Sequence, residues 1–173
     1  MKPSFINKKG FTLIELLVAL AIFLTVMTMA VSIFLTSLKN QRQGFLSQNL
    51  QDDARYIMEV IAKEVRMSNV YTATSDNSQE LWIKNQSNNN VRYCFTSIDG
   101  RPALTRKIGP SACNSHGASD RLNSSQVRVD GRFYVRNSAG EQPRVTVVLH
   151  IYPSTTTQPE MWIEDTITNR IYE

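Results

Sequence analysis

The feature that most constrains this chain is a long apolar segment that comes after a short basic leader and carries one carboxylate near its start. From Phe11 to Leu35 the only charged side chain is Glu15, and the segment contains no Gly or Pro. As a helix it would be about 37 Å long, which is enough to cross a bilayer with some tilt. A charged side chain costs about 3 kcal/mol at the centre of a membrane and less near the interface, so Glu15 requires a partner or a function.

The residues at the start of this segment resemble a known processing site. The run Gly10-Phe11-Thr12-Leu13-Ile14-Glu15 is similar to the junction that a dedicated peptidase cuts in type IV prepilins and type II secretion pseudopilins. The resemblance implies cleavage between Gly10 and Phe11, N-methylation of Phe11, and a role for Glu15 in filament assembly. It also implies four kinds of partner: a prepilin peptidase, other pilin or pseudopilin subunits, an inner-membrane assembly platform and membrane lipid.

Two simpler interpretations of the apolar segment explain less of it. A secretory signal has a shorter apolar core followed by small residues, which 28–30 imitates only loosely. A plain single-pass anchor accounts for the length but not for the Gly-Phe junction together with the carboxylate. Lys2, Lys8 and Lys9 favour a cytoplasmic leader. We therefore expect a single-pass protein of the bacterial inner membrane with its C-terminal part outside the cytoplasm, and in a pilus or pseudopilus after assembly.

Length and charge limit the part of the chain beyond the membrane segment. The chain has 173 residues, so the remainder is too short for more than one ordinary domain. Removing the three leader lysines from the formal net charge of +4 leaves +1. The high isoelectric point is therefore no argument for nucleic-acid binding.

The helical period continues beyond the membrane segment. Apolar residues recur there at spacings of three or four, which predicts one face of an amphipathic helix, while charged and amide side chains occupy the other face. The predicted apolar face comprises Leu46, Leu50, Ala54, Ile57, Ile61 and Val65, and the polar face Gln48, Asp52, Arg55, Glu59, Lys63 and Arg66.

The rest of the chain predicts an antiparallel sheet. Short runs rich in β-branched and aromatic residues are separated by Asn, Ser, Gly or Pro clusters. Asp99-Gly100 and Asp130-Gly131 are hairpin signals. A sheet with one apolar face would cover the apolar face of the helix, so the predicted fold is α+β and pilin-like, with a long N-terminal helix packed on an antiparallel β-sheet. The predicted strands contain 81–83, 91–95, 103–105, 127–129, 133–135, 145–152 and 161–163, and loops are expected at 85–90 and 154–157.

Later segments narrow the resemblance. The regions 48–56 and 62–67 are similar to the stretch after the membrane span in minor pilins of the W type and pseudopilins of the J type, and 165–172 is similar to their endings. The resemblance and the periodicity together divide the chain into a leader at 1–10, a transmembrane half-helix at 11–35, an amphipathic half-helix at 36–70 and an extracytoplasmic β-rich domain at 71–173. The expected function is that of a minor pilin or pseudopilin in a type IV pilus or a type II secretion pseudopilus.

Both cysteines lie on the expected exported side. In an oxidising compartment, Cys94 and Cys113 could close a loop worth about 3 kcal/mol in the chain-entropy model. The alternatives are two unpaired small apolar side chains or a metal site, for which the sequence shows no repeated Cys or His spacing. We expect the disulfide, no metal and no cofactor.

One polar loop gathers residues with catalytic chemistry. Ser115, His116 and Asp120 are of the types that serve as a nucleophile, a base and an orienting group. No nucleophile elbow or other motif reinforces them, so we expect a structural protein rather than an enzyme. His150 is expected to be a packed or edge histidine. The carboxylates Asp76, Asp120 and Asp130 do not follow an EF-hand pattern.

An alternative function is adhesion or DNA binding by a subunit displayed on the pilus. Aromatic residues could form a ligand platform, although their strand positions favour core packing. Acidic residues are sparse around a set of ten cations, which would support salt-dependent binding of DNA. The aromatic residues are Trp82, Tyr93, Tyr134, Tyr152 and Trp162, and the cations are Lys84, Arg92, Arg101, Arg106, Lys107, Arg121, Arg128, Arg132, Arg136 and Arg144.

Overall fold

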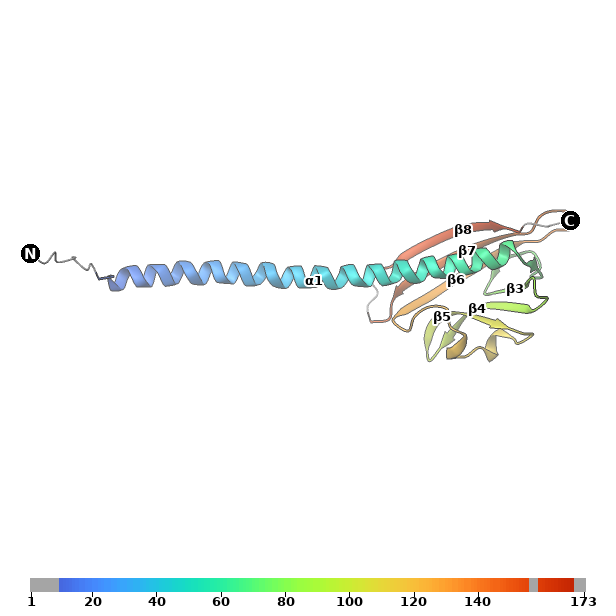
Figure 1. Cartoon of the computed structure of the whole chain (residues 1–173), viewed down its shortest axis with the longest axis horizontal. Helices are drawn as coiled ribbons and strands as arrows, with labels where there is room; N and C mark the ends of the chain where they lie inside the picture. Colours follow the sequence, from blue (N-terminus) through green and yellow to red (C-terminus); the bar gives the residue numbers. More distant parts are fainter. Residues whose placement is uncertain (1–9, 156–158, 170–173) are drawn as a thin grey trace, which may run out of the picture. The chain divides into compact units, whose positions relative to one another are not determined.

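A computed structural model describes residues 10–155 and 159–169 of the chain (Figure 1). The expected leader lies outside these residues except for Gly10, as do parts of the loop expected at 154–157 and of the ending at 165–172. The chain forms two compact units, Met1–Gly44 and Phe45–Glu173. In chain order the elements are α1 (Leu13–Arg66), β1 (Asn69–Val70), β2 (Ser75–Ser78), β3 (Glu80–Lys84), β4 (Asn90–Ile98), β5 (Arg101–Ile108), the 3-10 turns η1 (Cys113–Ser115) and η2 (Ala118–Asp120), β6 (Val127–Arg136), β7 (Arg144–Pro153) and β8 (Met161–Thr168).

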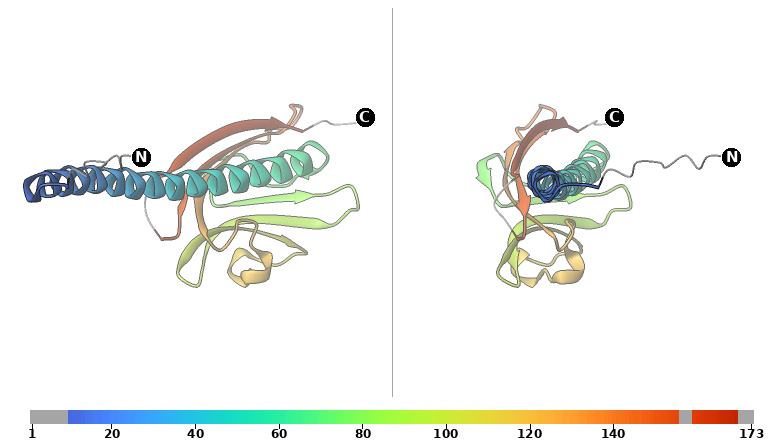
Figure 2. Two further views of the ribbon diagram at one scale, coloured as in Figure 1. Left: turned by 60° about the vertical axis from the view of Figure 1, so that its left-hand side comes forward. Right: turned by 90° about the vertical axis from the view of Figure 1, so that its left-hand side faces the viewer.

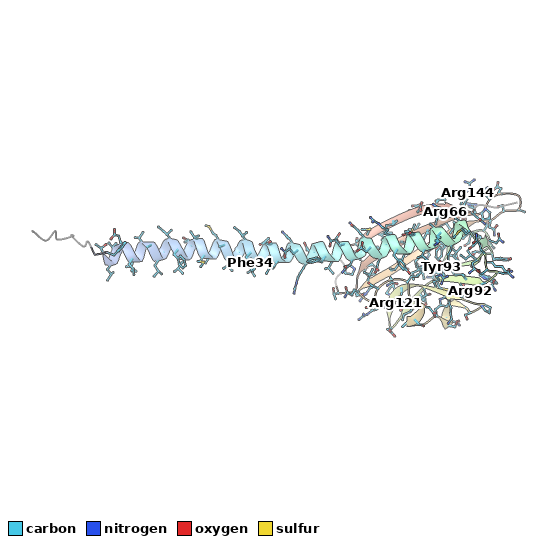
Figure 3. All side chains as sticks on the ribbon, viewed as in Figure 1. Phe34, Arg66, Arg92, Tyr93, Arg121 and Arg144 are labelled. Carbon is cyan, nitrogen blue, oxygen red and sulfur yellow. A yellow bond between two sulfur atoms is a disulfide. The ribbon has the colours of Figure 1, made fainter. Side chains whose placement is uncertain are left out.

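The described part of the first unit contains the apolar portion of α1. By length and composition alone, α1 is long and apolar enough to cross a membrane, and the most apolar window is entirely unburied. Figure 3 shows its side chains projecting all around the helix, with Phe34 labelled among them. Phe34 is 62% exposed, although burying an aromatic side chain of this size normally contributes about 1.5–3 kcal/mol. This surface requires an apolar environment that the unit itself does not supply.

The second unit contains two four-stranded sheets rather than the single sheet expected. Their strand orders are β1-β3-β4-β5 and β2-β6-β7-β8, and every pairing is antiparallel. Figures 1 and 2 show the outer part of α1 running alongside strands of both sheets. The α+β class and the packing of a long N-terminal helix on antiparallel sheet are confirmed. The short strands β1 and β2 were not predicted.

The first predicted hairpin is confirmed. Strands β4 and β5 pair up to Ile98 and Arg101, so that Asp99 and Gly100 form a two-residue connection. Their φ angles are 53° and 71°, in the left-handed region that a tight hairpin turn requires at both central positions.

The second predicted hairpin is wrong. Asp130 and Gly131 lie within β6, which pairs with β7 along its whole length. Along β6 every second residue faces the core, and this alternation continues through Gly131. A Cβ atom at Gly131 would collide with the carbonyl oxygen of Val148 and lie 2.8 Å from Cζ of Phe95. This glycine therefore allows Phe95 of one sheet to approach the backbone of the other, where the Phe95 ring lies 4.8 Å from the ring of Phe133.

The predicted apolar face of α1 is confirmed. Its residues from Leu50 onward are buried against the sheets, Leu46 is half-buried, and every residue of the predicted polar face is exposed. The other large side chains of this core come from both sheets, so a single apolar interior joins the helix to all the longer strands. The core includes Leu81, Ile83, Tyr93, Leu104, Phe133, Leu149, Ile151 and Ile167.

Three polar contacts fix the position of the helix and the sheets. Glu64 of α1 receives hydrogen bonds from Nε of Arg106, at 3.2 and 3.1 Å, and from the hydroxyl of Tyr93. Burial and the Glu64 carboxylate raise the pKa of Tyr93. Asp53 of α1 accepts hydrogen bonds from the backbone N–H and the hydroxyl of Ser124.

The third contact joins the sheets. The buried amide of Asn123 accepts from the Leu104 N–H of β5 at 3.1 Å and donates to the Val127 carbonyl of β6 at 2.6 Å. Because both ends of the side chain are paired, its burial carries no unsatisfied polar group.

Core packing of the aromatic residues is confirmed only for Tyr93. Trp82, Tyr134 and Trp162 are 36%, 40% and 65% exposed, because their strand neighbours occupy the inward positions. His150 is half-buried on the outer side of β7, where its ring stacks on Trp162 at 4.1 Å and its Nε2 lies 3.0 Å from Glu160.

Candidate processing and assembly site

The site indicated by the sequence lies where α1 begins. Gly10 and Phe11 precede the helix, and Phe11 is 88% exposed. The Glu15 carboxylate accepts hydrogen bonds from the backbone N–H and the hydroxyl of Thr12, at 3.1 and 3.0 Å. The Thr12 hydroxyl in turn accepts from the Glu15 N–H at 3.3 Å. The carboxylate is therefore bonded to the residue next to the proposed new N-terminus at Phe11.

This reciprocal pairing is a capping box. Thr12 stands immediately before the first helical residue and Glu15 three residues later, so that two backbone N–H groups at the helix start gain partners. A negative charge in the first turn also interacts favourably with the helix dipole. This role was not predicted from the sequence, although Thr-x-x-Glu before an apolar run is its recognised signature.

The surroundings of Glu15 are apolar and exposed. Leu13 and Leu16 are 78% and 60% exposed, and the large apolar side chains along the following turns are also at the surface. A carboxylate at one end of such a surface remains in contact with water in the isolated subunit. It would be desolvated if the apolar surface were covered by lipid or by other helices.

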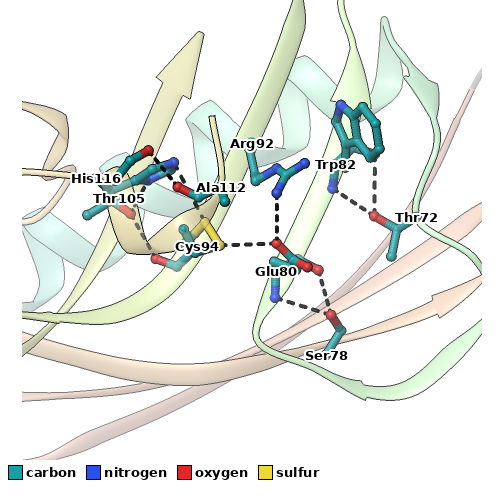
Figure 4. Close-up of a disulfide and its surroundings, with 11 residues drawn as sticks. Thr72, Ser78, Glu80, Trp82, Arg92, Cys94, Thr105, Ala112 and His116 are labelled. Carbon is teal, nitrogen blue, oxygen red and sulfur yellow. Dashed lines mark hydrogen bonds and ion pairs between the residues drawn. A yellow bond between two sulfur atoms is a disulfide. The ribbon is translucent and has the colours of Figure 1, made fainter. Parts of the chain in front are cut away.

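The second group of predicted residues lies in the globular unit. Cys94 and Cys113 are joined by a disulfide with a Cα–Cα distance of 5.7 Å. The bond ties the segment containing η1 to strand β4 (Figure 4). Glu80 Oε2 lies 3.2 Å from Sγ of Cys113, so these three side chains are clustered closely enough for metal ligands, but both sulfurs are used in the disulfide.

The three residues with catalytic chemistry do not form a hydrogen-bonded triad among the described side chains. The Ser115 hydroxyl donates to the Ala112 carbonyl, and the Asp120 carboxylate accepts from the Gly117 N–H. That hydrogen bond lowers the pKa of Asp120. His116 is half-buried, with Nδ1 2.7 Å from the Thr105 hydroxyl, so the arrangement provides no activated serine.

Half of the predicted basic set is paired with carboxylates. Of the ten cations in the predicted basic set, five form ion pairs with carboxylates, and the aromatic residues are divided between two different sheets. Neither arrangement makes a single ligand platform in the described residues. The three carboxylates tested against a calcium pattern each pair with a cation: Asp76 with Arg136, Asp120 with Lys107 and Asp130 with Arg132.

Comparison with known proteins agrees with the helix-start site. Residues 6–31 match the family model described as the prokaryotic N-terminal methylation motif. Over 75 residues, or 43% of this chain, the sequence is 33% identical to the pilin-like protein PilA3 of Thermus thermophilus. The match spans about a third of that protein, 32% of its length. No solved structure matches.

The apolar first helix packed against antiparallel sheet forms a pilin-like architecture, and the methylation motif lies at the start of that helix. At its N-terminal motif and over part of its length, the chain is similar to type IV pilin-like proteins.

Proposed function

We propose that this chain is a minor pilin or pseudopilin that is cut after Gly10, N-methylated at Phe11 and assembled through its first helix into a pilus or secretion pseudopilus. The observation that carries the proposal is the exposed apolar helix with Glu15 in its first turn. An unpartnered surface of this kind is suited first to the membrane and then to packing against other helices.

The proposed orientation follows from charge. Lysines are concentrated before Gly10, which favours retention of the leader in the cytoplasm and places the globular unit outside the inner membrane. The disulfide in that unit is compatible with an oxidising compartment.

The proposed assembly contact uses a charge that cleavage creates. Removal of the leader leaves a positively charged amine at Phe11. When helices pack together away from water, the Glu15 carboxylate of one subunit gains a partner in the Phe11 amine of a neighbour. A pair of buried charges is satisfied in only one register, so the contact aligns the subunits while the apolar surfaces supply most of the cohesion.

Intact-mass measurement of the membrane-extracted protein tests the proposal. We expect a chain that starts at Phe11 and carries one added methyl group. Gly10→Glu should leave the precursor uncut, because a bulky acidic side chain replaces the smallest residue at the scissile bond, whereas Gly44→Ala should be processed normally. A mature chain that starts at Met1, or near Val31 after an ordinary signal cleavage, would contradict the proposal.

A further inference from the structure

A half-buried histidine lies beside the disulfide, and the proposed filament role does not use it. His116 Nε2 is 3.8 Å from Sγ of Cys94, while Nδ1 on the other side of the ring is 2.7 Å from Oγ1 of Thr105 (Figure 4). Strand pairing holds Thr105 directly opposite Cys94. The imidazole is therefore held between a strand hydroxyl and a disulfide sulfur.

The hydrogen bonds of Thr105 determine which nitrogen of His116 carries the proton. The Thr105 hydroxyl has one hydrogen, and it donates that hydrogen to the carbonyl oxygen of Cys94 at 3.1 Å. At the contact with His116, the hydroxyl must therefore accept a hydrogen from Nδ1. The neutral ring consequently has a bare Nε2, whose lone pair faces the Cys94 sulfur.

The surroundings keep this ring neutral near pH 7. Burial is the largest effect and lowers the pKa of His116, and the positive charges of Lys107 and Arg92 lower it further. Asp120 and Glu80 act in the opposite direction, but the net shift is downward. A neutral imidazole with a free nitrogen is a base that can accept a proton at physiological pH.

The two cysteines differ in access. Cys94 is fully buried, whereas Cys113 is half-buried and lines a surface groove with Asn114 and Thr96. In the reduced protein, an external disulfide would therefore react first with Cys113. Cys94 would be left to complete the bond from the interior.

We propose that His116 is the general base that closes the Cys94–Cys113 disulfide after export. The Cys113 thiolate attacks a small-molecule or protein disulfide, forming a mixed disulfide and releasing one thiolate. His116 Nε2 then takes the proton from the Cys94 thiol, and the resulting thiolate attacks Cys113 Sγ. The Cys94–Cys113 bond forms, the second thiolate of the oxidant leaves, and the imidazolium returns its proton to that thiolate or to water. Two protein thiols are oxidised, and one external disulfide is reduced to two thiols.

Glu80 provides a contrast within the same site. Its carboxylate faces Cys113 as His116 faces Cys94, but a carboxylate is a much weaker base than a neutral imidazole at neutral pH. Replacing Glu80 by Gln therefore alters a sulfur-facing group without removing the proposed base.

The test follows formation of the Cys94–Cys113 disulfide in the reduced full-length protein in detergent micelles. Oxidised glutathione is the oxidant, and the mixed disulfide and the closed protein are separated by mass after acid quenching. Near-ultraviolet circular dichroism confirms that the reduced protein remains folded. At pH 7 an unassisted thiol with a pKa of about 8.5 is only a few per cent thiolate, so we expect His116→Phe to close about tenfold more slowly than wild type. Glu80→Gln should remain within about twofold of wild type.

The pH profile of wild type supplies a second measurement that requires no variant. The assisted closure rate should change little between about pH 7 and 8, whereas an unassisted thiol should gain almost tenfold over that interval. Equal rates for wild type and His116→Phe, or a wild-type rate that rises tenfold per pH unit through this range, would overturn the proposal. The proposal does not depend on the filament role, because closure is measured in the unassembled protein.

Discussion

The proposed role of Glu15 can be separated from its capping role by two substitutions at the helix start. Glu15→Gln keeps the capping box, because Gln serves at this position as Glu does, but it removes the negative charge. Thr12→Ala keeps the charge but removes the hydroxyl that bonds to Glu15 in both directions. The two variants therefore remove different halves of the same local structure.

The expected magnitudes differ clearly. Removing one partner of a desolvated ion pair leaves the other charge uncompensated, at a cost of about 3–5 kcal/mol, which corresponds to more than a hundredfold in an equilibrium. Loss of an N-cap side chain costs about 1 kcal/mol, or roughly fivefold. If Glu15 pairs with the Phe11 amine of a neighbour, Glu15→Gln should be incorporated far less than Thr12→Ala.

The assay compares the amount of each tagged variant in sheared filaments with the amount in membranes, using cells that also make the wild-type partner subunits. Both variants should insert into the membrane normally, since neither makes the segment less apolar. Incorporation of Glu15→Gln within about threefold of wild type would refute intersubunit pairing and leave capping as the only role for this carboxylate.

Three further predictions concern the globular unit. Gly131→Ala should destabilise the globular unit by about 3 kcal/mol or more in thermal or denaturant unfolding, because the added methyl group collides with the Val148 backbone. Gly117→Ala should be nearly neutral, because its added methyl group meets no atom within 4 Å. Equal stabilities of the two variants would contradict the packing argument. Non-reducing peptide mapping should recover the Cys94–Cys113 link, and two alkylated thiols in freshly isolated protein would exclude it. Burial raises the pKa of Tyr93 above the value of the unfolded chain, so the neutral side chain stabilises the fold below about pH 10 and this stabilisation is lost as the pH rises beyond that value. Tyr93→Phe should therefore reduce the loss of unfolding free energy at alkaline pH. An unchanged dependence of stability on pH would contradict this prediction.

The sequence predicted correctly those elements of the fold that depend on a local pattern, such as the spacing of apolar residues in a helix or a turn signal between two strands. The helix face from Leu50 to Val65 follows from spacing alone, and Asp99-Gly100 forms a turn because its strands end beside it. Asp130-Gly131 has the same local signal but a different structure. Val127, Val129, Phe133 and Val135 keep the inward period across it, and the space for Phe95 is a tertiary requirement that no local window contains.

The same distinction applies to the candidate sites. The capping box at Thr12 and Glu15 could be predicted from the sequence and was missed because the processing motif covers the same residues. The outward position of Trp82 also followed from its flanking residues, Leu81 and Ile83, which both point inward. In contrast, the contact of His116 with Cys94 depends on how the segment after β5 folds back over the strands, which spacing does not specify.

The proposed processing step and the proposed assembly contact both involve the helix start. Among the described residues, Glu15 carries the only charge in the first turn, and its carboxylate is hydrogen-bonded within its own subunit by Thr12. The proposed cleavage would add a positive amine at Phe11, close to the positive end of the helix dipole, where a positive charge is unfavourable. The carboxylate then has two possible partners, its own cap and the new amine of a neighbour. Because the cap can be lost for about 1 kcal/mol, whereas an unpaired charge between packed helices costs several times more, we expect assembly to favour transfer of Glu15 from the cap to the ion pair.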